Sequence, residues 1–220
     1  DIVLNQNSKL VFVGDKDQEI YSFRNVHNIF HKDLDFDKYN LTHSFRFGAC
    51  IADVANCLLD TYKDDNLAIV GLGKDELVFD ELETPYTYIT RTNAYLFDEA
   101  IQYILKGFKV HILGGESSIF QELEDAFNLY HGNFYKIKNV YIKNFKSFNN
   151  MKIYAEKTKD VEIYFLYKIK EKYKDNLSEY IVLLRNKLCG KKQANIILST
   201  THKAKGLEFF NVKLADDFFP

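Results

Sequence analysis

The chain has 220 residues, of which 46% are hydrophobic and 27% are charged, and its formal net charge is −2. These values are typical of a folded globular protein and exclude an intrinsically disordered one. Because the net charge is close to zero, any nucleic-acid site must be a local patch or groove. No apolar run reaches the ~18 residues of a membrane span, and the scattered cysteines Cys50, Cys57 and Cys189 form no C-x-x-C metal or redox motif.

Short apolar runs alternate with helical patterns along the chain. Strands are predicted at 9–13, 67–71, 86–90, 108–113, 196–200 and 212–214, and helices at 47–62, 94–105 and 120–130. Strands separated by helices of this length imply parallel crossovers. The pattern therefore predicts an α/β fold with a doubly wound parallel sheet, in which ligands bind at the carboxyl ends of the strands.

Residues 131–192 have a different composition and are predicted to be a helical insertion between two strands of the sheet. Helical periodicity covers 163–173 and 177–188, and lysines outnumber acidic residues between Lys136 and Lys174, with Tyr and Phe among them. Lysines mixed with aromatic residues can follow a nucleic-acid backbone and stack on bases. A small helical subdomain with a solvated face explains the same composition, and both interpretations stay open.

The first polar segment, Val13 to Arg24, follows the predicted strand at 9–13 and carries Gln18 in a polar turn. A Gln amide donates and accepts hydrogen bonds, so it can sense a terminal phosphate or orient a water molecule. The alternative is an ordinary strand-to-turn junction.

The second segment, Leu41 to Phe47, places Arg46 beside Phe45 just before a predicted helix. The guanidinium can reach a phosphate while the ring stacks on a base, although a core Phe and a surface Arg would look the same.

The third segment, Thr90 to Ala94, carries Arg91 and Asn93 at a strand end, where Thr92 or Asn93 could simply cap the next helix. The fourth segment, Ser199 to Phe209, follows a buried strand. It combines hydroxyls, a His, two Lys, a Gly and a Glu, a density of polar groups that folding alone does not explain.

The order and spacing of these segments resemble motifs III, IV, the R-T-N-A segment and motif V of UvrD/Rep-type superfamily 1 helicases. Motif III of that family, V-G-D-x-x-Q-x-I-Y-x-F-R, matches Val13 to Arg24 at every specified position. Motif V, T-x-H-x-A-K-G-L-E-F, matches Thr200 to Phe209. The variants at 41–48, 91–100, 202–209 and 216–218 are most similar to the F-box DNA helicase branch and favour it over helicase–nuclease subunits. The resemblance covers nearly the whole chain.

This resemblance implies a RecA-like P-loop NTPase fold and an ATP-dependent 3′–5′ DNA helicase that moves along single-stranded DNA. It divides the chain into four parts: the C-terminal end of the first RecA-like domain (1–38), the first part of the second (39–130), the helical insertion (131–192) and the return of the second domain with motif V (193–220).

The resemblance also implies roles for individual residues. Gln18 and Arg46 match residues that contact the γ-phosphate and form the expected catalytic pair. The residues expected to bind ATP are Gln18, Phe45, Arg46, Gly206 and Glu208, and those expected to bind DNA are Tyr21, Phe23, Arg24, Arg91, Asn93, Thr201 and His202. Phe45 stands where many members have a Tyr that stacks on adenine, and Phe23 stands where many have a Trp.

The resemblance also implies that this chain is a fragment, because it lacks the Walker A loop, the Walker B box and motif VI, which supplies a second phosphate-contacting Arg in the family. No G-x-x-x-x-G-K-[ST] loop occurs, and the G-x-G-K-D run at 71–75 and the acidic pair at 98–99 are imitations of nucleotide-site motifs. The Mg²⁺ ligands are therefore expected outside this chain, and the segment alone is not expected to hydrolyse ATP.

An alternative to the helicase is a non-catalytic DNA- or partner-binding module from a split or degenerate helicase. The expected partners are single-stranded DNA, the first RecA-like domain and, if an F-box lies upstream, ubiquitin-ligase components. The expected location is intracellular: the nucleus in a eukaryotic cell, otherwise the cytoplasm or a viral replication site.

Overall fold

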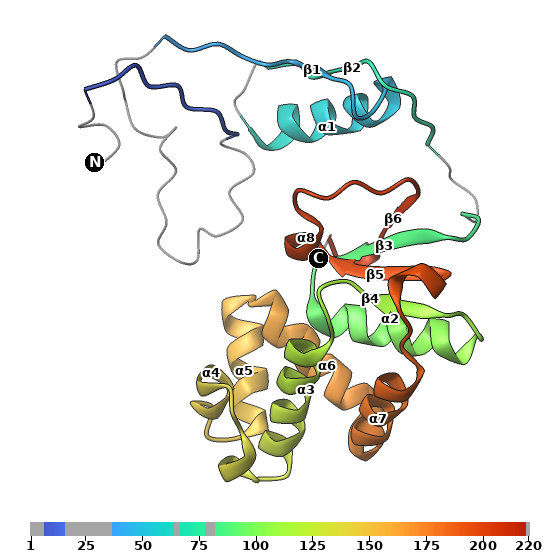
Figure 1. Cartoon of the computed structure of the whole chain (residues 1–220). Helices are drawn as coiled ribbons and strands as arrows, with labels where there is room; N and C mark the ends of the chain where they lie inside the picture. Colours follow the sequence, from blue (N-terminus) through green and yellow to red (C-terminus); the bar gives the residue numbers. More distant parts are fainter. Residues whose placement is uncertain (1–6, 16–36, 64–66, 78–81, 219–220) are drawn as a thin grey trace. The chain divides into compact units, whose positions relative to one another are not determined.

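The computed structural model describes residues 7–15, 37–63, 67–77 and 82–218. The chain forms two units, Asp1–Phe79 and Asp80–Pro220 (Figure 1). None of the helices in these described ranges is long and apolar enough to cross a membrane.

The first unit contains a pair of short parallel strands and one helix. Strand β1 (His43–Ser44) pairs with β2 (Val70–Gly71) in parallel, with His43 opposite Val70. Helix α1 (Ala49–Tyr62) connects them. The Asn56 side chain of α1 donates to the carbonyl oxygen of Ile69 at 2.9 Å and accepts from its N–H at 2.8 Å, and so ties the helix to the residue before β2.

The apolar face of α1 is largely uncovered in this unit. Ile51, Val54 and Leu58 recur at helical spacing, yet their side chains are 42–47% exposed, and Ala52 is the buried residue of the helix. The helix predicted at 47–62 is confirmed. The buried strand predicted at 9–13 is wrong, because this stretch is not a strand of either described sheet and Val11 and Val13 are more than 80% exposed. An apolar run does not by itself specify a buried strand, because strand propensity depends on the packing that the folded chain provides.

The second unit is built on a four-stranded sheet with the order β4-β5-β3-β6. Its strands are β3 (Tyr86–Thr90), β4 (Val110–Ile112), β5 (Ile196–Thr200) and β6 (Val212–Leu214). Every pair is parallel. The predicted α/β class with a parallel sheet is confirmed, and each predicted strand of this unit overlaps an observed one.

Helix α2 (Asn93–Leu105) packs directly against the sheet, and the helices α3 (Ser117–Tyr130), α6 (Val161–Tyr173) and α7 (Leu177–Lys187) pack against α2 in turn (Figure 1). The interface is apolar because α2 turns Leu96, Phe97 and Ile101 toward the core, where each is fully buried. The central strand β5 contributes Ile196 and Leu198, which are also fully buried.

Residues 131–192 are largely helical. Besides α6 and α7, which agree with the predicted periodicity, they contain α4 (Val140–Lys143) and α5 (Phe148–Thr158). Short 3-10 turns lie at η4 (Phe134–Lys136), η5 (Lys174–Asn176) and η6 (Lys191–Gln193). Side-chain caps from Ser147 and Asp160 begin α5 and α6, because each accepts a hydrogen bond from the N–H three residues on. The remaining short elements of the unit, α8 (Thr201–Ala204) and η7 (Asp216–Phe218), follow β5 and β6.

A buried lysine lies inside this helical part. Lys170 of α6 is 1% exposed, and its Nζ lies 3.7 Å from the ring centroid of Tyr130 on α3. Burial lowers the pKa of this ammonium group. The face of the ring offsets part of that cost, because its negative quadrupole attracts the cation.

We expect the Lys170–Tyr130 contact to contribute measurably to stability. A double-mutant cycle of Lys170→Met and Tyr130→Leu should give a coupling free energy of about 0.5–2 kcal/mol in urea unfolding followed by tyrosine fluorescence. The matched control is the Lys168–Tyr164 pair, where Lys168 is exposed and its Nζ lies 5.2 Å from the ring centroid. A coupling at Lys170–Tyr130 no larger than that of the control pair would contradict the expectation.

Candidate functional site at the carboxyl edge of the sheet

The parallel register brings the polar loops of the second unit to one edge of the sheet. Thr90, the last residue of β3, lies opposite Thr200, the last residue of β5. The segments that begin at Arg91 and Thr201 therefore leave the sheet side by side, although they are far apart in the sequence. The turn after β6 reaches the same edge, because Leu214 lies opposite Ile89.

A buried carboxylate joins two of these loops. Asp217 is 3% exposed, and its oxygens accept hydrogen bonds from the backbone N–H of Arg91 at 2.9 Å and of Thr92 at 2.9 Å. The hydroxyl of Thr92 lies 3.2 Å from the same carboxylate. This carboxylate therefore binds the backbone of Arg91 and not its guanidinium.

Hydroxyl groups add further links at this edge. Thr92 caps α2, because its Oγ1 accepts from the N–H of Tyr95 at 3.1 Å. Thr201 Oγ1 donates to the carbonyl of Thr90 at 3.2 Å and so joins the loop after β5 to the end of β3. Of the two capping candidates that the sequence leaves open, Thr92 is therefore the cap.

A half-buried lysine links α8 to the loop after β4. Lys203 Nζ donates to the carbonyl oxygen of Gly115 at 2.9 Å, and burial lowers the pKa of this ammonium group. On the neighbouring helix α3, Glu122 accepts from Asn93 Nδ2 at 3.3 Å, while burial raises the pKa of the carboxyl group. Charged and amide groups thus lie together behind the exposed edge.

The structure gives each predicted DNA-binding residue of the second unit a position at this edge. Arg91, Thr201 and His202 are exposed, and Asn93 is half-buried. Arg91 lies directly after β3 and Asn93 is the first residue of α2, and Thr201 and His202 lie in α8, which directly follows β5. The remaining predicted DNA contacts, Tyr21, Phe23 and Arg24, lie outside the described residues.

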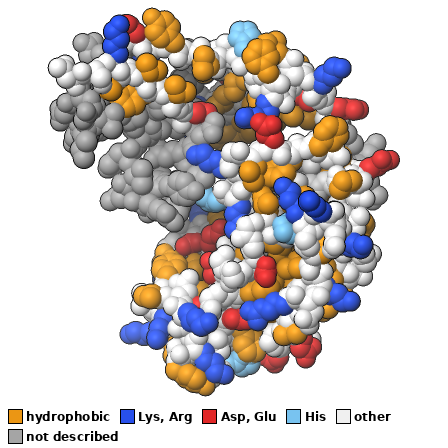
Figure 2. Space-filling model, viewed as in Figure 1, with side chains coloured by type: hydrophobic (Ala, Val, Ile, Leu, Met, Phe, Trp, Pro, Cys, Tyr) orange, Lys and Arg blue, Asp and Glu red, His pale blue; other side chains and the backbone are white. Residues whose placement is uncertain are grey.

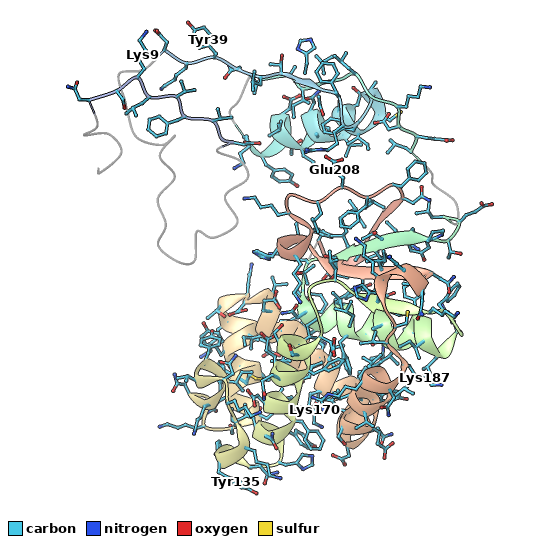
Figure 3. All side chains as sticks on the ribbon, in the orientation of Figure 1. Lys9, Tyr39, Tyr135, Lys170, Lys187 and Glu208 are labelled. Carbon is cyan, nitrogen blue, oxygen red and sulfur yellow. The ribbon has the colours of Figure 1, made fainter. Side chains whose placement is uncertain are left out.

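The predicted nucleotide-binding residues fall in both units. In the first unit, Phe45 and Arg46 lie in the loop between β1 and α1, and the Phe45 ring is 81% exposed. In the second unit, Gly206 and exposed Glu208 follow α8, as Figure 3 shows for Glu208. Gly206 has a φ of +79°, a conformation that other residues rarely adopt. Gln18 lies outside the described residues.

Three residues that organise this edge received no role from the sequence: Asp217 and Lys203, which lie in segments that the motifs singled out, and Glu122. A signal existed for Asp217, because an acidic pair directly after a predicted strand at the carboxyl edge is placed to bind backbone N–H groups. Glu122 carried no local signal, since it lies on a helix and meets Asn93 only in the folded chain.

The helical part of the second unit carries an excess of positive charge. Residues 136–174 contain eleven lysines and four acidic residues, although the whole chain has a net charge of −2. Lys172 pairs with Asp98 at 2.7 Å, the one ion pair that the described residues provide for these lysines. Figure 2 shows Lys and Arg side chains on the surface of this part. Uncompensated charge of this kind attracts polyanions.

The described residues hold no group of three or more His, Cys, Asp or Glu side chains that could bind a metal ion. The acidic pair Asp98–Glu99 lies within α2, and Asp98 binds Lys172 and the hydroxyl of Tyr173. Asp98 therefore joins two helices.

The chain is thus a parallel α/β protein with a polar carboxyl edge. Its sequence is similar to those of proteins named as helicases. It is 34% identical to F-box DNA helicase 1 of Gallus gallus over an alignment of 241 positions, which covers 99% of this chain and 23% of that protein. It is 30% identical over 249 residues to F-box DNA helicase protein 1 of Schizosaccharomyces pombe, covering all of this chain and 28% of that protein. No family model and no solved structure matches the chain.

These similarities support a relationship to the DNA helicase family. The chain spans about a quarter of the length of the curated relatives that it matches.

We expect Asp217 to stabilise the second unit strongly. Asp217→Ala leaves buried N–H groups without their acceptor and should lower the free energy of unfolding by about 2–4 kcal/mol. Asp216→Ala is the matched control, because Asp216 is exposed and its loss should change stability by less than about 0.5 kcal/mol. Urea midpoints of the two variants test this, and equal midpoints would show that the carboxylate of Asp217 is dispensable.

Proposed function

We propose that this chain is the DNA-contacting and phosphate-sensing part of an ATP-dependent 3′–5′ DNA helicase of the UvrD/Rep type that moves along single-stranded DNA. One observation carries the proposal. The segments Arg91–Asn93 and Thr201–His202 share one edge of a parallel sheet, in a chain similar over its whole length to proteins named DNA helicases. In this proposal the second unit belongs to a RecA-like domain.

On the DNA side, the carboxyl edge offers the groups that a nucleic-acid backbone requires. The Arg91 guanidinium suits a phosphate, and the Asn93 amide, the Thr201 hydroxyl and the His202 ring can contact phosphate and sugar oxygens. Their backbones are held by Asp217 and by the link from Thr201 to Thr90. The lysine excess of the helical part supports a polyanionic partner of the same kind.

On the nucleotide side, the loop between β1 and α1 presents Arg46 beside the exposed Phe45 ring. A guanidinium and an aromatic face together fit a phosphate and a base. Bound ATP with Mg²⁺ would supply the phosphoryl group whose transfer drives movement. We propose that Arg46 stabilises the γ-phosphate charge, that Gln18 senses it, and that Gly206 and Glu208 lie near the nucleotide.

We propose that the P-loop and the Mg²⁺ ligands of the ATPase site belong to the first RecA-like domain, and that this domain is the partner of this chain. Ubiquitin-ligase components are further partners if the protein carries an F-box, a word that the names of both relatives contain. The proposed DNA substrate places the protein inside the cell, and in the nucleus of a eukaryotic cell.

One observation favours a second candidate, a non-catalytic DNA- or partner-binding module. No G-x-x-x-x-G-K-[ST] loop occurs in the 220 residues, so the chain has no lysine and amide cradle for the β- and γ-phosphates. Such a module would retain the DNA contacts and show no turnover.

ATP hydrolysis by the full-length gene product separates the two candidates. The helicase requires DNA-stimulated hydrolysis, and Arg46→Ala should lower its kcat by about 10³-fold because it removes the charge that stabilises the transferring phosphate. Arg46→Lys should recover only part of this loss. Absence of DNA-stimulated turnover in the wild type would remove the helicase and leave the binding module.

Single-stranded DNA binding tests the carboxyl edge. Arg91→Ala should weaken binding to an oligonucleotide and reduce the slope of log K against log salt concentration by about 0.7, the contribution of one phosphate contact. Arg91→Lys should preserve most of the slope. Lys106→Ala, an exposed change at the C-terminal end of α2 and outside the helical part, serves as the control. If fluorescence anisotropy gives the same slope for Arg91→Ala and the wild type, Arg91 does not contact the DNA.

A further inference from the structure

The G-x-G-K-D run Gly71–Asp75 imitates part of a phosphate-binding loop in sequence, but in the structure it packs against another segment of the first unit. It runs beside the loop that carries Arg46. The N–H of Leu72 donates to the carbonyl of Ser44 at 2.8 Å, and the N–H of Gly73 donates to the carbonyl of Phe47 at 2.9 Å. The residues on both sides of Arg46 are therefore bound by backbone hydrogen bonds to this one run.

Asp75 completes the arrangement from the end of the run. Its carboxylate accepts hydrogen bonds from the backbone N–H of Gly48 at 2.8 Å, of Ile51 at 2.8 Å and of Cys50 at 3.2 Å. These groups belong to the N-terminus of α1, whose N-cap residue, Gly48, has no side chain to bind them. A negative charge at this end also suits the helix dipole. A residue more than twenty positions away thus supplies the cap.

The close approach of the two segments depends on glycine. A Cβ atom added at Gly71 would lie 2.0 Å from the carbonyl oxygen of Gly48, and one added at Gly73 would lie 2.9 Å from the carbonyl carbon of Phe47. Both contacts are with backbone, which cannot rotate away as a side chain can. The two glycines therefore allow the run to lie directly against the Arg46 loop.

We propose that Asp75 is a positioning residue for Arg46. The carboxylate fixes the backbone just after Arg46, while the bonds to Ser44 and Phe47 fix the loop on either side of it, so that the guanidinium is presented from a backbone of one conformation. The proposal rests on the proposed function, in which Arg46 meets the γ-phosphate. Stabilisation of a transferring phosphate depends steeply on placement, and a shift of about 1 Å can cost about 10²-fold in rate.

A double-mutant cycle in the full-length gene product tests the proposal, with DNA-stimulated ATP hydrolysis as the readout. Asp75→Ala should lower kcat by about tenfold or more and change the KM for ATP by less than about twofold, because positioning acts in the transition state. In the Arg46→Ala background, Asp75→Ala should have no further effect. Asp53→Ala is the matched control, because Asp53 is an exposed acid on α1, the helix that Asp75 caps.

Amide hydrogen exchange on the same proteins provides a readout independent of turnover. Asp75→Ala should accelerate exchange at Gly48, Cys50 and Ile51, and Asp75→Asn, which keeps one acceptor oxygen and the shape of the side chain, should show an intermediate change in both exchange and kcat. Gly73→Ala should accelerate exchange at the same amides through the close contact with Phe47.

Two outcomes would overturn the proposal. One is an equal fold-loss of kcat from Asp75→Ala with and without Arg46, which would show that Asp75 acts on turnover by another route. The other is unchanged exchange at the three amides. If Arg46→Ala alone keeps wild-type turnover, the role proposed for Arg46 fails, and the exchange data still decide whether Asp75 orders the loop.

Discussion

The parallel register between β3 and β5 is the constraint on which the second unit depends. With Tyr86 opposite Ile196 and Thr90 opposite Thr200, both strands start and end together. The polar residues that follow them must therefore leave the sheet at one edge. A shift by one residue would turn the side chains of a strand to the opposite face and remove buried residues such as Leu198 from the core. Burial of the strands thus fixes the positions of the exposed residues.

The loops at that edge are held mainly by side chains bound to backbone. Asp217 accepts from two backbone N–H groups, Thr201 donates to the carbonyl of Thr90, and Lys203 donates to the carbonyl of Gly115. These residues use their own polar groups to fix the chain path. The side chains of Arg91 and His202 are exposed. Such a division supports a site whose backbone is ordered before a ligand arrives.

Side chains bound to backbone groups also hold the loops of the first unit. Asp75 caps a helix that begins more than twenty residues earlier, and Asn56 hydrogen-bonds to both backbone groups of Ile69. Neither contact could be read from local patterns. A cap is normally sought within three residues of the helix start, and Asn56 lies thirteen positions from Ile69. The glycines at 71 and 73 only imitate a nucleotide loop in sequence, and in the structure they allow close backbone packing.

The sequence by itself determined the four strands of the second unit and its helices α2, α3, α6 and α7, because apolar periodicity and helix-boundary residues act locally. It also showed that polar segments follow β3 and β5. Only the tertiary structure decided the strand order, the pairing of Asp217 with Arg91 and Thr92, and the burial of Lys170 against Tyr130. The physical reason is distance along the chain. These contacts join residues that are tens of positions apart or more, and they form only when burial of the apolar faces brings those residues together.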